Sequence, residues 1–203
     1  MSFEPEQTDD ELLFRLRSGD RQAFTALYRR RQGAIYRYSL HMSNSQALAE
    51  DITQEVFLVL LRKKCGYDSA RGSLAGYLLG IARKLLLKQT GRGVEISIDF
   101  ADDSPGPPQL AVNPNPLGDL THREGLEALH RAVAALPRPY REVVVLCDIE
   151  EVAYADAAEA LEIPIGTVRS RLHRARAILA DKLDRFCNTR QPVTSLKPAR
   201  SLI

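Results

Sequence analysis

Four arginines lie close together between Ile163 and Leu179, in a segment that reads IPIGTVRSRLHRARAIL and contains no acidic residue. The planar guanidinium group donates paired hydrogen bonds that match the oxygens of a phosphate or the edge of a guanine base. If the segment is helical, its polar side chains form a face that suits a DNA major groove. The side chains expected to contact double-stranded DNA are Thr167, Arg169, Ser170, Arg171, His173, Arg174 and Arg176.

A sharp corner must precede this helix if the basic face is to enter a groove. Pro164 cannot lie inside a helix, while Gly166 and Thr167 suit the turn and the N-cap of the helix that follows. Without other signals, an arginine-rich helix is about as often a solvated surface helix as a DNA-binding helix. The corner and the apolar packing faces of the two helices favour a helix-turn-helix instead. Those faces are Val168, Leu172, Ala175 and Leu179 against Ala157, Ala158 and Leu161.

The chain just before the corner carries the opposite charge. Every ionised side chain from Glu142 to Glu162 is acidic. Acidic helices are repelled by a phosphate backbone, so we expect the basic helix to be the element that contacts DNA.

A second group of cations surrounds an aromatic residue on the helix predicted from Ser73 to Gln89. Tyr77, Lys84 and Lys88 share one stripe, and Arg83 and Arg92 lie nearby. Bases of single-stranded DNA stack on aromatic rings while lysines contact the phosphates, although a tyrosine that merely packs on its helix is commoner. The preceding polar loop, residues 66–72, could receive an extruded base.

The helix predicted over residues 48–62 has two apolar faces. One is a stripe of Leu48, Ile52, Val56 and Val59, and the other contains Phe57, Leu58 and Leu61 beside Glu50 and Gln54. Such a helix is either the buried centre of a bundle or an element whose second face binds another protein. Hydrophobic patterning alone favours burial.

The positions of the periodic segments predict an all-α protein with two small helical domains. Residues 9–92 are expected to form the first domain, and its four helices would cover residues 10–17, 20–41, 45–64 and 73–89. Residues 93–122 contain five prolines and form an acidic, extended Pro-rich linker. Residues 123–186 would form the helix-turn-helix domain from four shorter helices, and residues 187–203 a loose tail.

The bulk composition restricts the function classes. Net charge is only +2, so nucleic-acid binding has to come from local patches. No Gly-rich phosphate loop, metal-ligand cluster or activated nucleophile is present, so we expect no catalysis, metal or cofactor. Cys65, Cys147 and Cys187 lack paired spacing. The acidic start and the lack of a membrane-length apolar run predict a cytoplasmic protein without membrane insertion.

Four segments together resemble the extracytoplasmic-function (ECF) group of bacterial sigma factors of the sigma-70 family. They are DDELLFRLRSGDRQAFTALY, AEDITQEVFLVLLRK, SLAGYLLGIARKLLLK and IPIGTVRSRLHRARAIL, and the resemblance extends from Asp9 to Leu183 outside the linker. The last segment also resembles helices of other regulators. The alternative is a stand-alone helix-turn-helix regulator. The combination of the last segment with the motif Asp51-x-x-Gln54-Glu55-Val56-Phe57 distinguishes a sigma factor from such a regulator.

The resemblance implies a division of labour on core RNA polymerase. One helix would bind the clamp of the largest subunit through Glu50, Asp51, Gln54, Glu55, Phe57, Leu58 and Leu61. The melted minus-10 strand would be captured by Tyr77, Arg83, Lys84, Lys88 and Arg92, and the arginine-rich helix would read the minus-35 element as duplex. The linker would run toward the RNA exit channel. An anti-sigma factor is a further expected partner.

Three positions depart from the pattern of the ECF group. The group usually has Trp where Tyr77 stands and Asn where Lys84 stands, and its following acidic position is here Lys88 or Gln89. The resemblance therefore does not fix the minus-10 preference.

Overall fold

The computed structural model describes residues 7–62, 66–89, 91 and 120–188, and over these residues the chain forms helices and connecting turns without a strand. The all-α prediction is confirmed. The elements are α1 (Asp9–Arg17), α2 (Arg21–Ser43), α3 (Gln46–Leu61), α4 (Leu74–Gln89), α5 (Leu120–Ala134), α6 (Arg138–Val144), the π-helical turn η1 (Val145–Ile149), α7 (Tyr154–Leu161) and α8 (Ile165–Asn188).

Short polar side chains set the boundaries of the first three helices. Thr8 and Glu11 form a reciprocal capping box on α1, and Asp20 accepts hydrogen bonds from the first backbone N–H groups of α2. Ser45 caps α3 in the same way. These side chains satisfy N–H groups that have no partner within their own helix, which explains why the predicted starts lie within a residue of the observed ones.

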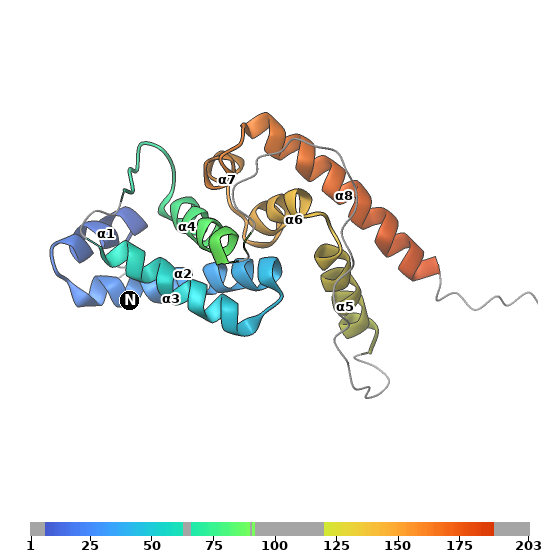
Figure 1. Ribbon diagram of the computed structural model, residues 1–203, viewed down its shortest axis with the longest axis horizontal. Coiled ribbons are helices and arrows are strands. Elements are labelled where there is room, and N and C mark those ends of the chain that lie inside the picture. Colours follow the sequence, from blue (N-terminus) through green and yellow to red (C-terminus); the bar gives the residue numbers. More distant parts are fainter. Residues whose placement is uncertain (1–6, 63–65, 90, 92–119, 189–203) are drawn as a thin grey trace, which may run out of the picture.

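The first four helices form a bundle around α2, which packs against α1, α3 and α4 (Figure 1). Its core consists of large apolar side chains that are almost fully buried, among them Leu12, Leu27, Ile35, Ile52 and Leu78. On α4 the buried face is Leu74, Leu78, Leu79, Ala82 and Leu86, while Ile81 and Leu85 are only half-buried.

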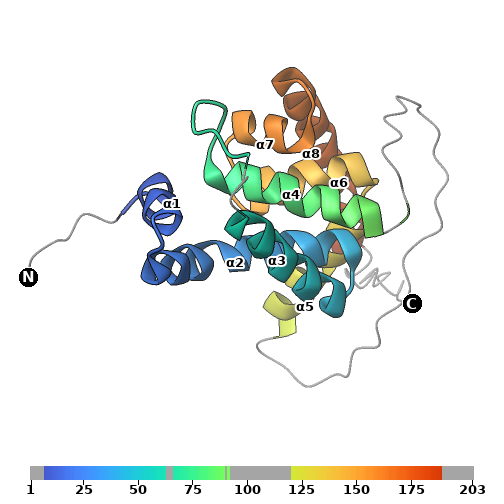
Figure 2. The ribbon, with the colours of Figure 1, turned by 60° about the vertical axis from the view of Figure 1, so that its left-hand side comes forward.

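The remaining helices pack around the long helix α8, which contacts α5, α6 and α7. Val143, Leu146, Leu161 and Leu172 fill the space between them. This second group of helices is joined to the first, because α7 lies along α4 in both views (Figures 1 and 2). The Pro-rich segment 93–119 lies outside the described residues, and the division into separately folding domains stays a prediction.

One predicted contact residue has to be reassigned. Phe57 was expected on the exposed face of α3, yet it is only 3% exposed. Its ring lies 4.7 Å from that of Tyr28 and meets Phe24 edge to face at 6.1 Å, both on α2. The aromatic partners on α2 bury Phe57, so its side chain belongs to the core. Leu58, the next residue, is 53% exposed.

Two alanine substitutions separate these roles. We expect Phe57→Ala to lower the free energy of unfolding by about 3–5 kcal/mol, because it leaves a cavity among aromatic rings. Leu58→Ala should stay within about 0.5 kcal/mol of the parent protein. Urea unfolding followed by circular dichroism measures both, and equal losses would contradict the assignment.

Candidate nucleic-acid interface

The corner between α7 and α8 presents the arginine-rich face to solvent. Glu162 ends α7 in the left-handed conformation at φ 57°, and α8 begins at Ile165. The carbonyl of Pro164 accepts hydrogen bonds from the backbone N–H groups of Thr167 and Val168 at 2.8 and 3.2 Å. Thr167 therefore lies in the first turn of α8. The sequence had suggested Thr167 as the N-cap of this helix, and that prediction is wrong. The helix starts earlier because Pro164 directly precedes it and its carbonyl already accepts intrahelical bonds.

The predicted packing face of α8 is buried as expected. Val168, Leu172 and Ala175 are at most 2% exposed, and they turn the polar side chains outward. Arg169, Ser170, His173, Arg174 and Arg176 are all exposed, whereas Thr167 and Arg171 are half-buried.

The arginines of this face differ in their partners. Arg176 donates two hydrogen bonds to Asp148 of η1, at 3.1 and 2.6 Å, and this contact raises its pKa. Within the described part of the chain, Arg169 and Arg174 form no ion pair. Two of the cations are thus available to a phosphate or a base, and Arg176 is already bound.

The second predicted stripe lies on α4, and two of its cations, Arg83 and Lys84, form ion pairs. Tyr77 is half-buried, with its ring 5.5 Å from that of Tyr67. Lys84 Nζ lies 2.7 Å from a Glu162 carboxylate oxygen, and Arg83 Nε donates to Glu142 at 3.3 Å. Lys88 is exposed, and Arg92 lies outside the described residues. The sequence did not indicate that acidic residues of the second half would pair with this stripe.

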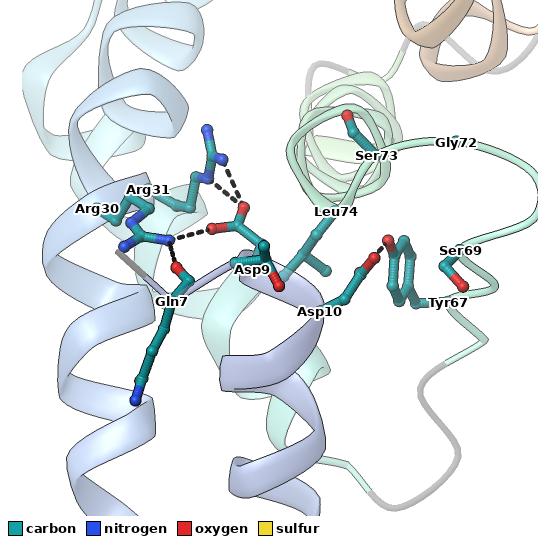
Figure 3. A pocket seen from close by; sticks show the side chains of 11 residues that line it. Gln7, Asp9, Asp10, Arg30, Arg31, Tyr67, Ser69, Gly72, Ser73 and Leu74 are labelled. Carbon is teal, nitrogen blue, oxygen red and sulfur yellow. Dashed lines mark hydrogen bonds and ion pairs between the residues drawn. The ribbon is translucent and has the colours of Figure 1, made fainter. Parts of the chain in front are cut away.

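A polar hollow of about 550 Å³ lies beside the loop 66–73 (Figure 3). Tyr67, Ser69 and Ser73 form one wall, and α1 and α2 form the others. The Tyr67 hydroxyl donates to Asp10 at 2.6 Å, a hydrogen bond that connects the loop to α1. The loop that was expected to receive a base therefore borders a space that could hold one.

The far wall of this hollow was missed by sequence reasoning. Asp9 accepts hydrogen bonds from Arg30 at 3.0 Å and from Arg31 at 2.6 Å, which ties the start of α1 to α2 (Figure 3). These partners are more than twenty residues apart, and no local motif joins them. Only the acidic first turn of α1 and the adjacent arginines of α2 hinted at a pair.

The exposed face of α3 is the third surface. Leu58 and Leu61 are 53% and 48% exposed, whereas Ile52, Val56, Phe57 and Leu60 of the same helix are buried. Glu50, Asp51 and Gln54 are exposed on the same helix, and Glu55 forms an ion pair with Arg62 at 3.2 Å. An apolar pair bordered by acidic and amide groups suits a protein partner better than DNA.

The described residues hold no group of three or more His, Cys, Asp or Glu side chains placed to bind a metal ion. Among the described helices, none combines the length and the apolar character needed to cross a membrane.

A helical bundle joined to a helix-turn-helix with an exposed basic face defines the class of the protein, and known families match both parts. Residues 27–92 match the family model for Sigma-70 region 2, and residues 126–179 match that for Sigma-70, region 4. The chain belongs to the sigma-70 family, in its ECF group. The presence of region 2 beside region 4 favours a sigma factor over a stand-alone helix-turn-helix regulator.

Relatives support the same assignment along most of the chain. The ECF RNA polymerase sigma factor SigE of Mycolicibacterium smegmatis is 36% identical over 82% of this chain, which spans 65% of that relative's length. The ECF RNA polymerase sigma-E factor of Escherichia coli K12 is 28% identical, and the match covers 87% of this chain and 94% of that protein. The sigma factor RpoE of Bartonella quintana, solved in complex with the anti-sigma factor NepR, superposes with a TM-score of 0.55 at 26% identity, covering 75% of this chain and 91% of RpoE.

The pairing of Arg83 predicts that its role is partly structural. Arg83→Met leaves the Glu142 carboxylate, which is 4% exposed, with fewer compensating hydrogen bonds, and should cost about 1–3 kcal/mol of stability. Lys84→Met breaks a solvent-exposed pair and should cost less than about 1 kcal/mol. Parallel thermal and urea unfolding of the two variants checks the order, and a larger loss for Lys84→Met would contradict it.

Proposed function

We propose that this chain binds core RNA polymerase and directs it to promoters by holding the minus-35 element as duplex and the minus-10 element as a melted strand. It has no catalytic activity of its own and needs no cofactor. The observation that carries the proposal is the exposed apolar pair Leu58 and Leu61 on a helix whose opposite face is buried, located in the same chain as a basic helix-turn-helix. A regulator that acts alone on DNA does not require such a surface.

The polymerase contact is assigned to α3. Leu58 and Leu61 supply apolar area, and Glu50, Asp51 and Gln54 provide polar contacts around it. The partner is the clamp of the largest subunit. Phe57 takes part only by fixing α3 against α2, since its ring is buried there.

The minus-35 contact is assigned to the exposed face of α8. Arg169, Ser170, His173 and Arg174 project from the N-terminal half of the helix, which is the part that enters the major groove in helix-turn-helix docking. Arg174 is the candidate for a base contact and Arg169 for a phosphate. Thr167 and Arg171 are placed at the edge of this face.

The minus-10 contact is assigned to α4 and the hollow beside it. The adjacent rings of Tyr67 and Tyr77 offer a surface for base stacking, and the polar hollow can accept one nucleobase turned out of the strand. Lys84, Lys88, Arg83 and Arg92 are the proposed phosphate contacts. The hydroxyl and carboxylate groups that line the hollow could hydrogen-bond to the edge of the base.

An anti-sigma factor is proposed as a further partner. The structurally similar RpoE of Bartonella quintana was solved in complex with the anti-sigma factor NepR. An exposed apolar pair such as Leu58 and Leu61 is costly to leave in water, and a masking partner would cover it when the polymerase does not.

The polymerase contact can be tested with two leucines of similar exposure. Leu58→Asp should weaken association with purified core enzyme at least tenfold, about 1.4 kcal/mol, and reduce run-off transcription accordingly. Leu126→Asp on α5, where the parent leucine is 46% exposed, should change neither. Gel filtration and in vitro transcription measure the two effects. A protein that footprints duplex DNA alone and never co-elutes with core would overturn the proposal in favour of a stand-alone regulator.

The minus-35 contact can be tested by comparing two arginines of α8. Arg174→Ala should cost about 1–3 kcal/mol at one base pair if the side chain reads a base. Arg176→Ala should have a smaller effect on binding, because Asp148 already holds that side chain. Holoenzyme binding to a panel of single-base promoter variants gives both numbers. A loss after Arg174→Ala that is uniform across the panel would reassign Arg174 to a phosphate.

A further inference from the structure

The ion pair between Arg176 and Asp148 lies at the edge of the exposed face of α8. Arg176 donates to the Asp148 carboxylate through Nε at 3.1 Å and through Nη2 at 2.6 Å. A guanidinium that binds a carboxylate in this bidentate way forms a strong, charge-assisted contact, and the pair as a whole carries no net charge. The two side chains are 55% and 29% exposed, so the pair can be reached from solvent. At the position where the sequence predicts a cation, the structure therefore presents a neutralised group.

Helical geometry places Arg176 on the same side of α8 as Arg169. Side chains seven residues apart on an α-helix point within about 20° of each other and lie about 10 Å apart along the axis. Both arginines border the exposed side chains Ser170, His173 and Arg174. Cations at the edge of a reading helix meet the phosphates of the groove wall, while the central side chains reach the base edges. This side of α8 thus offers two phosphate contacts, and in the described part of the chain Arg169 forms no ion pair whereas Arg176 does.

The π-helical turn η1 holds Asp148 in place next to α8. Its residues Val145 and Leu146 are buried. Glu150, directly after the turn, accepts hydrogen bonds from Arg37 of α2 at 2.8 and 2.6 Å, and its side chain is only 1% exposed. Turns of this kind are rare and are frequently found at functional sites. Contacts on both sides of Asp148 therefore anchor the carboxylate beside Arg176.

From this geometry we infer that Asp148 withholds Arg176 from the DNA backbone and so sets how many phosphates α8 binds. The inference rests on the proposed function, because it takes α8 as the helix that reads the minus-35 element. Asp148 acts through Arg176 and is a positioning residue that contacts no DNA itself. Its effect is a lower affinity for every duplex, whereas the base preference given by Arg174 stays the same.

Counterion release is the physical reason for this effect. DNA gives up condensed cations when a protein cation neutralises a phosphate, and the logarithm of the binding constant falls with the logarithm of salt concentration by about 0.9 per phosphate. A guanidinium that is already paired with a carboxylate releases no such counterion, and the carboxylate repels the phosphate. Removing the charge of Asp148 would therefore add one phosphate contact at Arg176.

The isosteric substitution Asp148→Asn tests the inference. The full-length chain and the variant are titrated onto a fluorescein-labelled duplex of mixed sequence at several salt concentrations, and fluorescence anisotropy reports binding. We expect the variant to bind about fivefold more tightly at low salt and to show a salt dependence that is steeper by about 0.9. A salt dependence equal to that of the parent protein would overturn the inference.

A charge control and a double variant show whether the gain comes through Arg176. Asp184→Asn, farther along α8, changes the net charge equally and should leave the salt dependence as it is in the parent. The double variant Asp148→Asn with Arg176→Gln should return to the parent's salt dependence, because the released cation is absent. An equal gain for Asp184→Asn, or a double variant that binds as tightly as Asp148→Asn alone, would contradict the inference.

The two single variants of the pair separate withholding from a purely structural role. Asp148→Asn and Arg176→Gln break the same pair, so a contact that only holds η1 against α8 would make both variants bind DNA more weakly. The inference requires opposite changes, with tighter binding after Asp148→Asn and unchanged or weaker binding after Arg176→Gln. Weaker binding by both variants would overturn it.

The failure of the inference and that of the proposed minus-35 contact give different results. If α8 does not read DNA, Arg174→Ala will bind the duplex as the parent protein does. If only the inference is wrong, Arg174→Ala will weaken binding while Asp148→Asn leaves the salt dependence unchanged.

Discussion

A buried carboxylate at the junction of the two halves constrains the whole arrangement. Glu142 is 4% exposed and receives hydrogen bonds from Arg83 of α4 at 3.3 Å and from Arg138 of its own helix at 3.2 Å. Removing water from a carboxylate costs free energy unless cations or hydrogen-bond donors replace the hydration. Burial beside Glu142 also raises the pKa of Tyr38 on α2, so that hydroxyl stays protonated. The position of α6 relative to α4 is therefore fixed by a requirement for charge compensation.

The character of that junction differs from the packing on either side of it. Within each half, large apolar side chains are almost fully buried, as Leu27 and Ile52 are in the first half and Leu172 is in the second. Between the halves, α7 approaches α4 closely at Gly76 and Gly80, and exposed ion pairs such as Lys84–Glu162 flank that contact. Buried apolar side chains of both halves nevertheless belong to one continuous core. The junction thus adds polar contacts and charge pairs to a shared apolar core.

Sequence reasoning succeeded where the signal was local. Helix starts followed from capping residues such as Asp20 and Ser45, and the α7–α8 corner followed from Pro164. It failed where the answer depended on distant partners. Phe57 is buried because Tyr28 and Phe24 lie opposite it, and no periodicity within α3 could reveal them.

The largest gap between sequence and structure concerns the cations of α4. The sequence predicts them as a nucleic-acid surface, and their acidic partners are 59 or more residues away in the chain, as for Arg83 and Glu142. The opposite charges of the two segments were visible in the sequence, and each was interpreted by itself. Complementary charges on two helices do not by themselves predict a contact. They predict one only when the fold is already known to place the two helices side by side.

Arg83 and Lys84 are adjacent in sequence, but their ion pairs differ in burial. Arg83 is largely covered, and its planar fork is committed to a carboxylate that would otherwise be buried without enough partners. Lys84 carries a mobile ammonium group on an exposed stem, and its partner Glu162 is also exposed. Releasing Lys84 to a phosphate returns Glu162 to water at little cost, whereas releasing Arg83 would strand Glu142. Loss of the Lys84 pair would therefore cost little stability, whereas loss of the Arg83 pair would leave the buried Glu142 with Arg138 as its remaining ion-pair partner.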